Sequence, residues 1–189
     1  MTQHVNNVCG NATHAIRCIG RIRHYLDQAT TEKLVHAYVT SRLDQCNSLL
    51  YGLPDEEIAK MQRVQNTAAR LVTRAKKQDS ISKIMRDLHW LPIRKRIAFK
   101  ISLLTFKALH GQAPPYISEL ITPYTPYRTL RSSTQNLLKA PHRRPRTAYG
   151  RRSFAEAAYK EWNNLPLHVR LAPSINVFKT QLKTFLFNQ

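Results

Sequence analysis

The side chains of this 189-residue protein that could do chemistry are above all its cations. Lys and Arg number 30 against 11 Asp and Glu, which leaves a formal net charge of +19 and a pI near 10.4. A positive field of this strength attracts polyanions. Nucleic acid, an anionic membrane surface and an acidic protein all fit it, and a plain solvated surface is the alternative without function.

The other reactive side chains form no catalytic pattern. No two Asp residues are adjacent, whereas a two-metal nucleotidyl-transfer site needs neighbouring Asp residues to hold hard cations. The chain contains no GxxxxGK[ST], HExxH or GxSxG motif. Cys9, His14 and Cys18 do not have the spacing of zinc ligands. We therefore expect no enzymatic activity, no bound metal and no cofactor.

The elements that carry the cations begin with a predicted antiparallel helix pair. Apolar or small residues recur every three or four positions from Val5 to Leu26, which is the spacing of one buried helix face. Thr30 or Thr31 is expected to cap a second helix, and only four or five residues separate the two. The predicted apolar faces consist of Val5, Val8, Ala12, Ala15, Ile19, Ile22 and Leu26, then Leu34, Val35, Tyr38, Val39 and Leu43.

A third helix is predicted over residues 55–77, after the Gly52–Pro54 break. Its acidic residues are confined to the first turn, where they suit the helix dipole. Cations lie opposite the apolar faces of the first and third helices, so they form either a solvated surface or a row that contacts phosphates. The candidates for phosphate contact are Arg17, Arg21, Lys60, Arg63, Arg70, Arg74, Lys76 and Lys77.

The second half of the chain predicts a central helix and a C-terminal helical part. The stretch 93–109 is apolar on most of its circumference, which is typical of a mostly buried helix. Trp90 and Trp162 sit among apolar residues and are expected in the core rather than on a base-stacking surface. Ser174 is expected to cap the last helix, with Lys179 and Lys183 facing outward.

Residues 88–155 are poor in acid, with Glu119 the single carboxylate against thirteen Lys and Arg. Within them, 122–150 lacks helical periodicity and predicts a long loop, with room for a short strand at 136–140. Cations with tyrosines between them suit phosphates and bases of single-stranded nucleic acid, whereas a solvated linker is the alternative. The further candidates are Arg128, Arg131, Arg143, Arg144, Arg146, Arg151 and Arg152, with Tyr124, Tyr127 and Tyr149 interleaved.

The predicted fold class is mainly α: a small three-helix bundle, further helices and a long basic loop, with at most one short β-hairpin or strand. The predicted parts are 1–77, 78–122, 123–150 and 151–189. No signal-peptide pattern opens the chain and no cysteine framework is present, so we expect an intracellular protein of the nucleus or cytoplasm. The most apolar stretch, 97–109, carries Lys100 and Lys107 and is too short to span a membrane.

Several motifs follow one another in a characteristic order. They are LDQCNSLLYGLP (43–54), RVQNTAARL (63–71), LHWLP (88–92), FKALHG (106–111) with Ala113, Pro114 and Tyr116, RSS (131–133), then Tyr149, Gly150, Arg152, Phe154, Ala157, Ala158 and WNNLP (162–166). In this order they resemble the C-terminal part of the reverse transcriptase of LINE-type (non-LTR, jockey-like) retrotransposons. The resemblance covers nearly the whole chain.

The resemblance implies that residues 1–77 correspond to a polymerase thumb and that the rest corresponds to the C-terminal region. A thumb binds the backbone of RNA, DNA or an RNA–DNA hybrid, which needs basic helix faces and little base specificity. The Asp-Asp motif of the family's palm matches no position here, so no catalytic residue carries over. The chain departs from the family at Gln45, where an aromatic is common, and at Tyr159, where Pro is frequent.

Two other functions remain open at this stage. After nucleic-acid binding, the second hypothesis is a helical protein-interaction module, whose binding would survive high salt and nuclease. The third is a decayed element fragment without a selected function. Membrane binding is disfavoured, because the basic helices lack the large exposed apolar face that interfacial helices insert.

Overall fold

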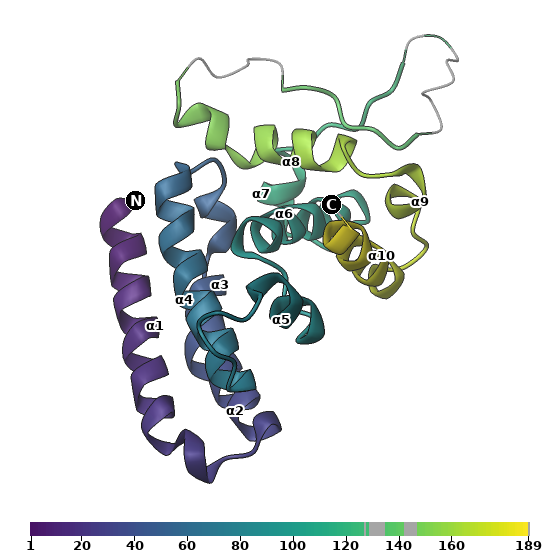
Figure 1. The fold of residues 1–189 in the computed structure, drawn as a ribbon. Helices are drawn as coiled ribbons and strands as arrows, with labels where there is room; N and C mark the ends of the chain where they lie inside the picture. Colours follow the sequence, from purple (N-terminus) through teal and green to yellow (C-terminus); the bar gives the residue numbers. More distant parts are fainter. Residues whose placement is uncertain (127, 129–134, 142–146, 189) are drawn as a thin grey trace. The chain divides into compact units, whose positions relative to one another are not determined.

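The computed structural model describes residues 1–126, 128, 135–141 and 147–188, and over these residues the chain is mainly α-helical (Figure 1). The predicted fold class is confirmed. The internal contacts divide the chain into two compact units, Met1–Arg96 and Ile97–Gln189. The finer four-part division predicted from the sequence stays a prediction. Within the described residues, no helix is long and apolar enough to cross a membrane.

Three helical rods form a bundle within the first unit. The first rod is α1 (Thr2–Ile22). The second joins α2 (Gln28–Val35), a π-helical turn (His36–Thr40) and α3 (Ser41–Asp44). The third is α4 (Asp55–Thr73), and each rod packs against the other two.

The directions of the rods follow from contacts near their ends. Lys60 of α4 lies 3.4 Å from Asn6, near the start of α1, and Arg23 lies 2.8 Å from the carbonyl of Val72, near the end of α4. Helices α1 and α4 therefore run parallel. Val5 and Leu43 line the same small cavity, so the second rod runs back alongside α1. The predicted antiparallel helix pair is confirmed.

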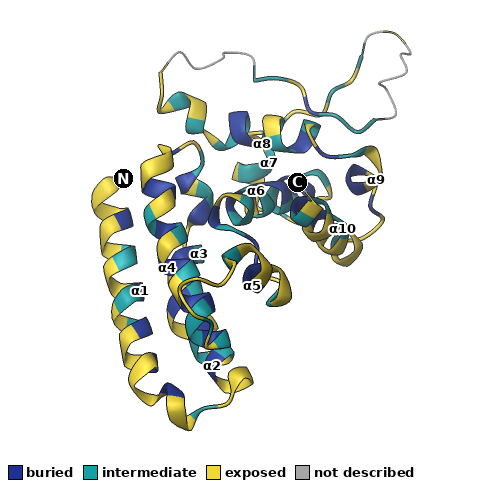
Figure 2. Ribbon diagram, viewed as in Figure 1, coloured by how far each residue is buried: buried dark blue, intermediate teal, exposed yellow. Residues whose placement is uncertain are grey.

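The core of this bundle differs from the predicted apolar faces at two positions. Ile22 is 46% exposed, because α1 ends there and a 3-10 turn follows. Tyr38 is 54% exposed, because the π-helical turn places the buried side at residues 35, 39 and 43 and leaves Tyr38 outside. Along α1, buried positions recur at intervals between exposed ones (Figure 2). The bundle core includes Val5, Ala12, Ile16, Ile19, Val35, Val39, Leu43, Met61, Val64, Ala68 and Val72.

The ends of two helices also correct the sequence analysis. Asp27, not Thr30 or Thr31, caps α2, since its carboxylate accepts a hydrogen bond from the Thr30 N–H at 3.1 Å. Helix α4 ends at Thr73 instead of running to residue 77. Arg74 follows it in the left-handed region at φ 55°, and the Lys76 N–H donates to Asp79 in the next turn.

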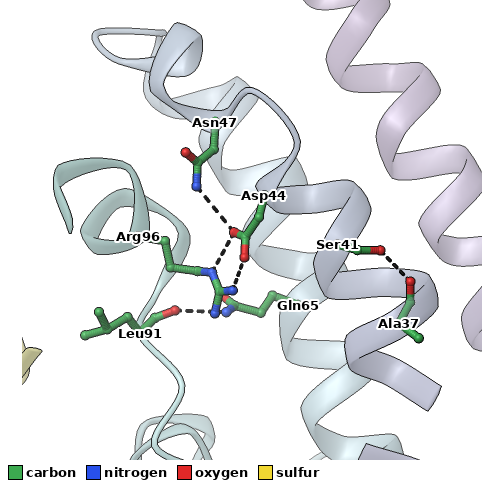
Figure 3. Close-up of polar contacts among 7 residues, drawn as sticks. All are labelled: Ala37, Ser41, Asp44, Asn47, Gln65, Leu91 and Arg96. Atoms are coloured by element: carbon green, nitrogen blue, oxygen red, sulfur yellow. Dashed lines mark hydrogen bonds and ion pairs between the residues drawn. The ribbon is translucent and has the colours of Figure 1, made fainter. Parts of the chain in front are cut away.

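An ion pair closes the junction between α3 and α4 (Figure 3). The guanidinium of Arg96 donates to both carboxylate oxygens of Asp44, with Nε 2.8 Å from Oδ1. Asn47 donates to the same carboxylate at 3.3 Å. Asp44 thus has a structural role at the end of α3. Leu50 is buried as part of this junction, whereas Leu49 is 64% exposed.

The segment between α5 (Ile81–Asp87) and α6 (Ile93–Leu109) lies along α4. Trp90 is 4% exposed, as predicted for a core residue, and its indole N–H donates to Glu32 at 3.2 Å. Gln65 of α4 donates to the Leu91 carbonyl at 2.9 Å (Figure 3). These side-chain bonds hold the segment on the bundle without regular secondary structure.

The second unit starts within α6 and continues with four more α-helices among the described residues. They are α7 (Pro115–Ser118), α8 (Phe154–Asn163), α9 (Leu167–Arg170) and α10 (Ile175–Asn188). The C-terminal helical part predicted from the sequence is formed by α8, α9 and α10. Stacked aromatic rings form its centre: Phe106 lies 4.4 Å from Phe178 and Trp162 lies 5.8 Å from Phe178, between ring centroids.

The strand allowed at 136–140 is reduced to one isolated antiparallel bridge, Pro123 with Leu138, and the described residues form no strand. The side-chain amide of Asn163 accepts a hydrogen bond from the Leu138 N–H at 2.9 Å and donates one to the Leu138 carbonyl at 3.0 Å. A neighbouring strand could not pair with Leu138 on that side, so the ladder ends there.

Candidate nucleic-acid interface

Helix α1 presents cations without acidic neighbours in sequence. No Asp or Glu occurs before Asp27. Arg17 and Arg21 are exposed and one helical turn apart, so they share one edge of α1, as predicted. His14, on the same side, contacts the Cys18 thiol at 3.6 Å. This edge therefore carries positive charge that no carboxylate of its own helix offsets.

Helix α4 repeats this arrangement. No acidic residue occurs between Glu57 and Asp79. Arg63 is exposed. Lys60 is 3.0 Å from Glu57 and also reaches Asn6 on α1, so its ammonium is held at the boundary between the two helices.

The two edges meet at an open cleft between α1 and α4. Its volume is about 240 Å³, and it is lined by Thr13, Ile16, Lys60, Arg63, Val64 and Thr67. Arg17 follows Thr13 by one turn and Arg21 follows Arg17 by another, so both continue the edge of α1 that borders the cleft. We call Arg17, Arg21, Lys60 and Arg63 the α1–α4 face.

The donors that the cleft can offer are the two cations. The Thr13 hydroxyl donates to the Cys9 carbonyl at 2.7 Å, and the Thr67 hydroxyl donates to the Arg63 carbonyl at 2.9 Å. Their protons are thereby used within the helices. Burial raises the pKa of the half-buried Cys9 thiol, which stays neutral and adds no negative charge here. An anion in the cleft would be held by Lys60 and Arg63.

The remaining predicted cations of α4 are engaged with the protein itself. Arg74 donates to the carbonyls of Arg23 and Leu26 at 3.3 and 3.5 Å. Arg70 is half-buried, and one of its terminal nitrogens lies 3.5 Å from the Lys77 carbonyl. The row predicted from Lys60 to Arg74 is therefore not uniform: its first part borders solvent, and its last part closes the end of the helix.

Arg23 is a structural residue that the sequence analysis missed. Its guanidinium donates to the carbonyls of Leu71, Val72 and Leu26 at 2.9, 2.8 and 2.7 Å. Burial, and next the nearby Arg74, lower the pKa of Arg23 from its ordinary value. Helical spacing could have identified Arg23 as a buried residue, because it continues the buried positions Ile16 and Ile19.

The other candidate residues fall into three groups. Lys76 and Lys77 are exposed after α4, in the first unit. Arg128 and Arg151 are exposed in the second unit, where the half-buried Arg152 places its guanidinium carbon 5.7 Å from the ring centroid of Tyr149. Arg131, Arg143, Arg144 and Arg146, with Tyr127, lie outside the described residues. A nucleic-acid role for all of these stays a prediction.

No three His, Cys, Asp or Glu side chains in the described part of the chain come together as a metal site. Comparison of the chain with protein-family models, with curated proteins and with solved structures gives no match.

Proposed function

We propose that this chain is a non-catalytic nucleic-acid-binding protein that holds the backbone of RNA, DNA or an RNA–DNA hybrid on its α1–α4 face. One observation carries the proposal: two parallel helices, α1 without acid and α4 without acid after Glu57, place Lys60 and Arg63 in one cleft and Arg17 and Arg21 beside it. Phosphates repeat along a nucleic-acid strand, so cations on successive helical turns can contact successive phosphates.

The cleft also favours contact with the backbone over recognition of a small anion. It is open, and its cations are Arg63 and Lys60, whose ammonium also pairs with Glu57. Arg17 and Arg21 extend the positive charge along α1, beyond the cleft itself. Such an extended surface binds phosphates with little sequence preference.

The ordered motifs support a more specific proposal about origin. They resemble the thumb and C-terminal region of a LINE-type, non-LTR retrotransposon reverse transcriptase, and the three-rod bundle of α1, α2–α3 and α4 has the form expected for residues 1–77. On this proposal the chain contributes backbone binding, and it has no polymerase or endonuclease activity of its own.

The salt dependence of binding tests the proposal. We expect the whole chain to bind a labelled RNA–DNA hybrid in fluorescence anisotropy, with an affinity that falls steeply as salt rises. Each phosphate contact contributes roughly 0.9 to the slope of log affinity against log salt for a B-form duplex. A variant with Arg17, Arg21 and Arg63 changed to Gln should lose up to about 2.7 of that slope.

A matched control removes the same charge elsewhere in the first unit. Lys33 on α2 and Lys83 and Arg86 on α5 are exposed, and changing all three to Gln should leave most of the slope in place. Equal losses in the two triple variants would show that net charge alone attracts the nucleic acid. Absence of binding by the wild-type chain at low salt would refute the proposal outright.

A helical protein-interaction module is the second candidate, and exposed apolar side chains of the second unit favour it. Tyr116 is 67% exposed, and Leu120 and Leu171 are 51% and 53% exposed. Capture of a defined protein partner that survives both high salt and nuclease treatment would support this function.

A further inference from the structure

The turn between α1 and α2 carries an aromatic ring that the core does not use. Tyr25 is 81% exposed. It belongs to the turn between α1 and α2, and this turn lies at one end of the first unit (Figure 1). Its ring lies against the imidazole of His24, with 3.7 Å between centroids and 43° between planes. Ile22, just before the turn, is 46% exposed. The end of the bundle is thus an apolar, aromatic surface within an otherwise strongly basic unit.

This turn is fixed from beneath. Arg23 points inward from its first position, and its guanidinium joins the Leu26 carbonyl of the turn to the Leu71 and Val72 carbonyls of α4. The Asp27 carboxylate, which follows the turn, is engaged with the N–H of Thr30 as the cap of α2. Ordering the Tyr25 backbone on binding therefore costs little entropy, because folding has already fixed it.

A cation of the α1–α4 face lies close to the ring along the chain. Arg21, in the last turn of α1, precedes Tyr25 by four residues. Arg74 lies against the same turn from the α4 side, where it donates to the carbonyls of Arg23 and Leu26 and fixes the turn. An exposed ring next to a phosphate-binding cation is the arrangement with which proteins stack an unpaired base while they hold the adjoining backbone.

We propose that Tyr25 is a base-stacking residue, so that the first unit takes a nucleic acid with an unpaired base at this end of the α1–α4 face. The inference rests on the proposed function, because the phosphates would be held by that face. A continuous duplex offers no free base to the ring. A single strand, or the single-stranded end of a duplex, does.

The test compares two strands that differ in their bases alone. The probes are a labelled oligothymidylate of about 12 nucleotides, within the usual range of site sizes, and an abasic strand of equal length. Changing Tyr25 to Ala should weaken binding of the oligothymidylate roughly 5- to 100-fold, the range found for loss of one stacked base, and leave its salt slope unchanged. Affinity for the abasic strand should stay the same, and Tyr25→Phe should bind both strands like the wild type.

Tyr38→Ala is the matched control, because Tyr38 is also exposed but lies on the second rod, in the π-helical turn. It should bind both strands like the wild type. If Tyr25→Ala binds the oligothymidylate as tightly as the wild type, or loses equal affinity for both strands, the stacking inference is overturned while backbone binding stands. If the wild type binds neither strand nor the RNA–DNA hybrid, the proposed function is overturned and the stacking inference with it.

Discussion

The arginines of the first unit form two groups that lie within a few helical turns of each other. One group faces solvent, and the other donates to backbone carbonyls. Arg17, Arg21 and Arg63 extend into solvent beside the cleft between α1 and α4. Arg23 and Arg74 instead donate to backbone carbonyls where α4 ends and where the chain turns from α1 to α2. The difference shows that cations aligned by helical spacing need not have one role. The hydrogen-bond partners of each guanidinium decide whether it is available to a ligand or holds the fold together.

The physical reason lies in the end of α4. The last four carbonyls of a helix have no partner within it, and they carry the negative end of the helix dipole. The end of α4 sits against the turn after α1, so donors must come from the protein. An arginine side chain suits this place, because its planar group donates to several carbonyls at once and stays charged. Cations at the bundle end are thus part of the fold, whereas those beside the cleft remain available for a ligand.

The largest effect predicted from this contrast is on stability. Changing Arg23 to Met should lower the free energy of unfolding by about 3 kcal/mol, because two carbonyls of α4 and that of Leu26 lose charged donors. Urea unfolding followed by circular dichroism measures it. Arg17→Met is the matched control, since Arg17 is exposed, and it should change stability by less than about 0.5 kcal/mol.

Lysine at position 23 sharpens the same test. Arg23→Lys keeps the charge but replaces a planar group of five N–H donors by one ammonium. We expect it to recover less than half of the lost stability. Full recovery would mean that the charge at the end of α4 matters and that the hydrogen-bond geometry at the Leu71 and Val72 carbonyls does not.

The sequence predicted those parts of the fold that depend on hydrophobic spacing. The burial of Trp90 and Trp162 and the outward position of Lys179 follow from periodicity, which side-chain packing then enforces. The antiparallel direction of the first two rods follows from the short connection between them. The exposure of Arg17, Arg21 and Arg63 followed in the same way. This is enough to locate the candidate face, although not to show that its two edges border one cleft.

The parts that were missed depend on single polar contacts. The local sequence does not show that the Asp27 carboxylate, and not the hydroxyl of Thr30 or Thr31, caps α2 by accepting from the Thr30 N–H. The π-helical turn that exposes Tyr38 was missed because it adds one residue to a regular repeat. In that turn the Ser41 hydroxyl donates to the Ala37 carbonyl, while the Ser41 N–H reaches back to His36 (Figure 3). These bonds join residues three to five apart, so several local bonds compete at each position and the sequence alone does not rank them.

A pair of single substitutions tests the contrast directly on α4. Arg74→Gln should lower the free energy of unfolding by about 0.5–1 kcal/mol, since two long hydrogen bonds are lost, and should leave the salt slope of nucleic-acid binding nearly unchanged. Arg63→Gln should do the reverse, with stability preserved and the salt slope reduced by about 0.9. Unfolding and anisotropy titrations on the same preparations give both quantities.

If Arg74→Gln reduces the slope as much as Arg63→Gln does, the whole row from Lys60 to Arg74 contacts phosphates. The row then does not divide into a ligand-binding and a structural part. If neither reduces it, α4 contributes no phosphate contact, and the cations of α1 or of the second unit carry the binding.

The smallest predicted effect concerns an anion at the same end of the bundle. Hydrogen bonds from Thr30 hold the pKa of the Asp27 carboxyl below its ordinary value of 3.8. The ionised form is therefore favoured in the folded protein, so its contribution to stability is complete above about that pH and is lost as the pH falls through the lowered pKa. The thermal midpoint of Asp27→Ala should lie below that of the wild type at neutral pH, and the gap should narrow in acid.

Glu56→Ala, an exposed acid in the first turn of α4, should show a smaller change with pH, because no side-chain hydrogen bond caps that helix. A gap for Asp27→Ala that stays constant from neutral pH into acid would mean that the polar contact, and not the charge, stabilises the start of α2.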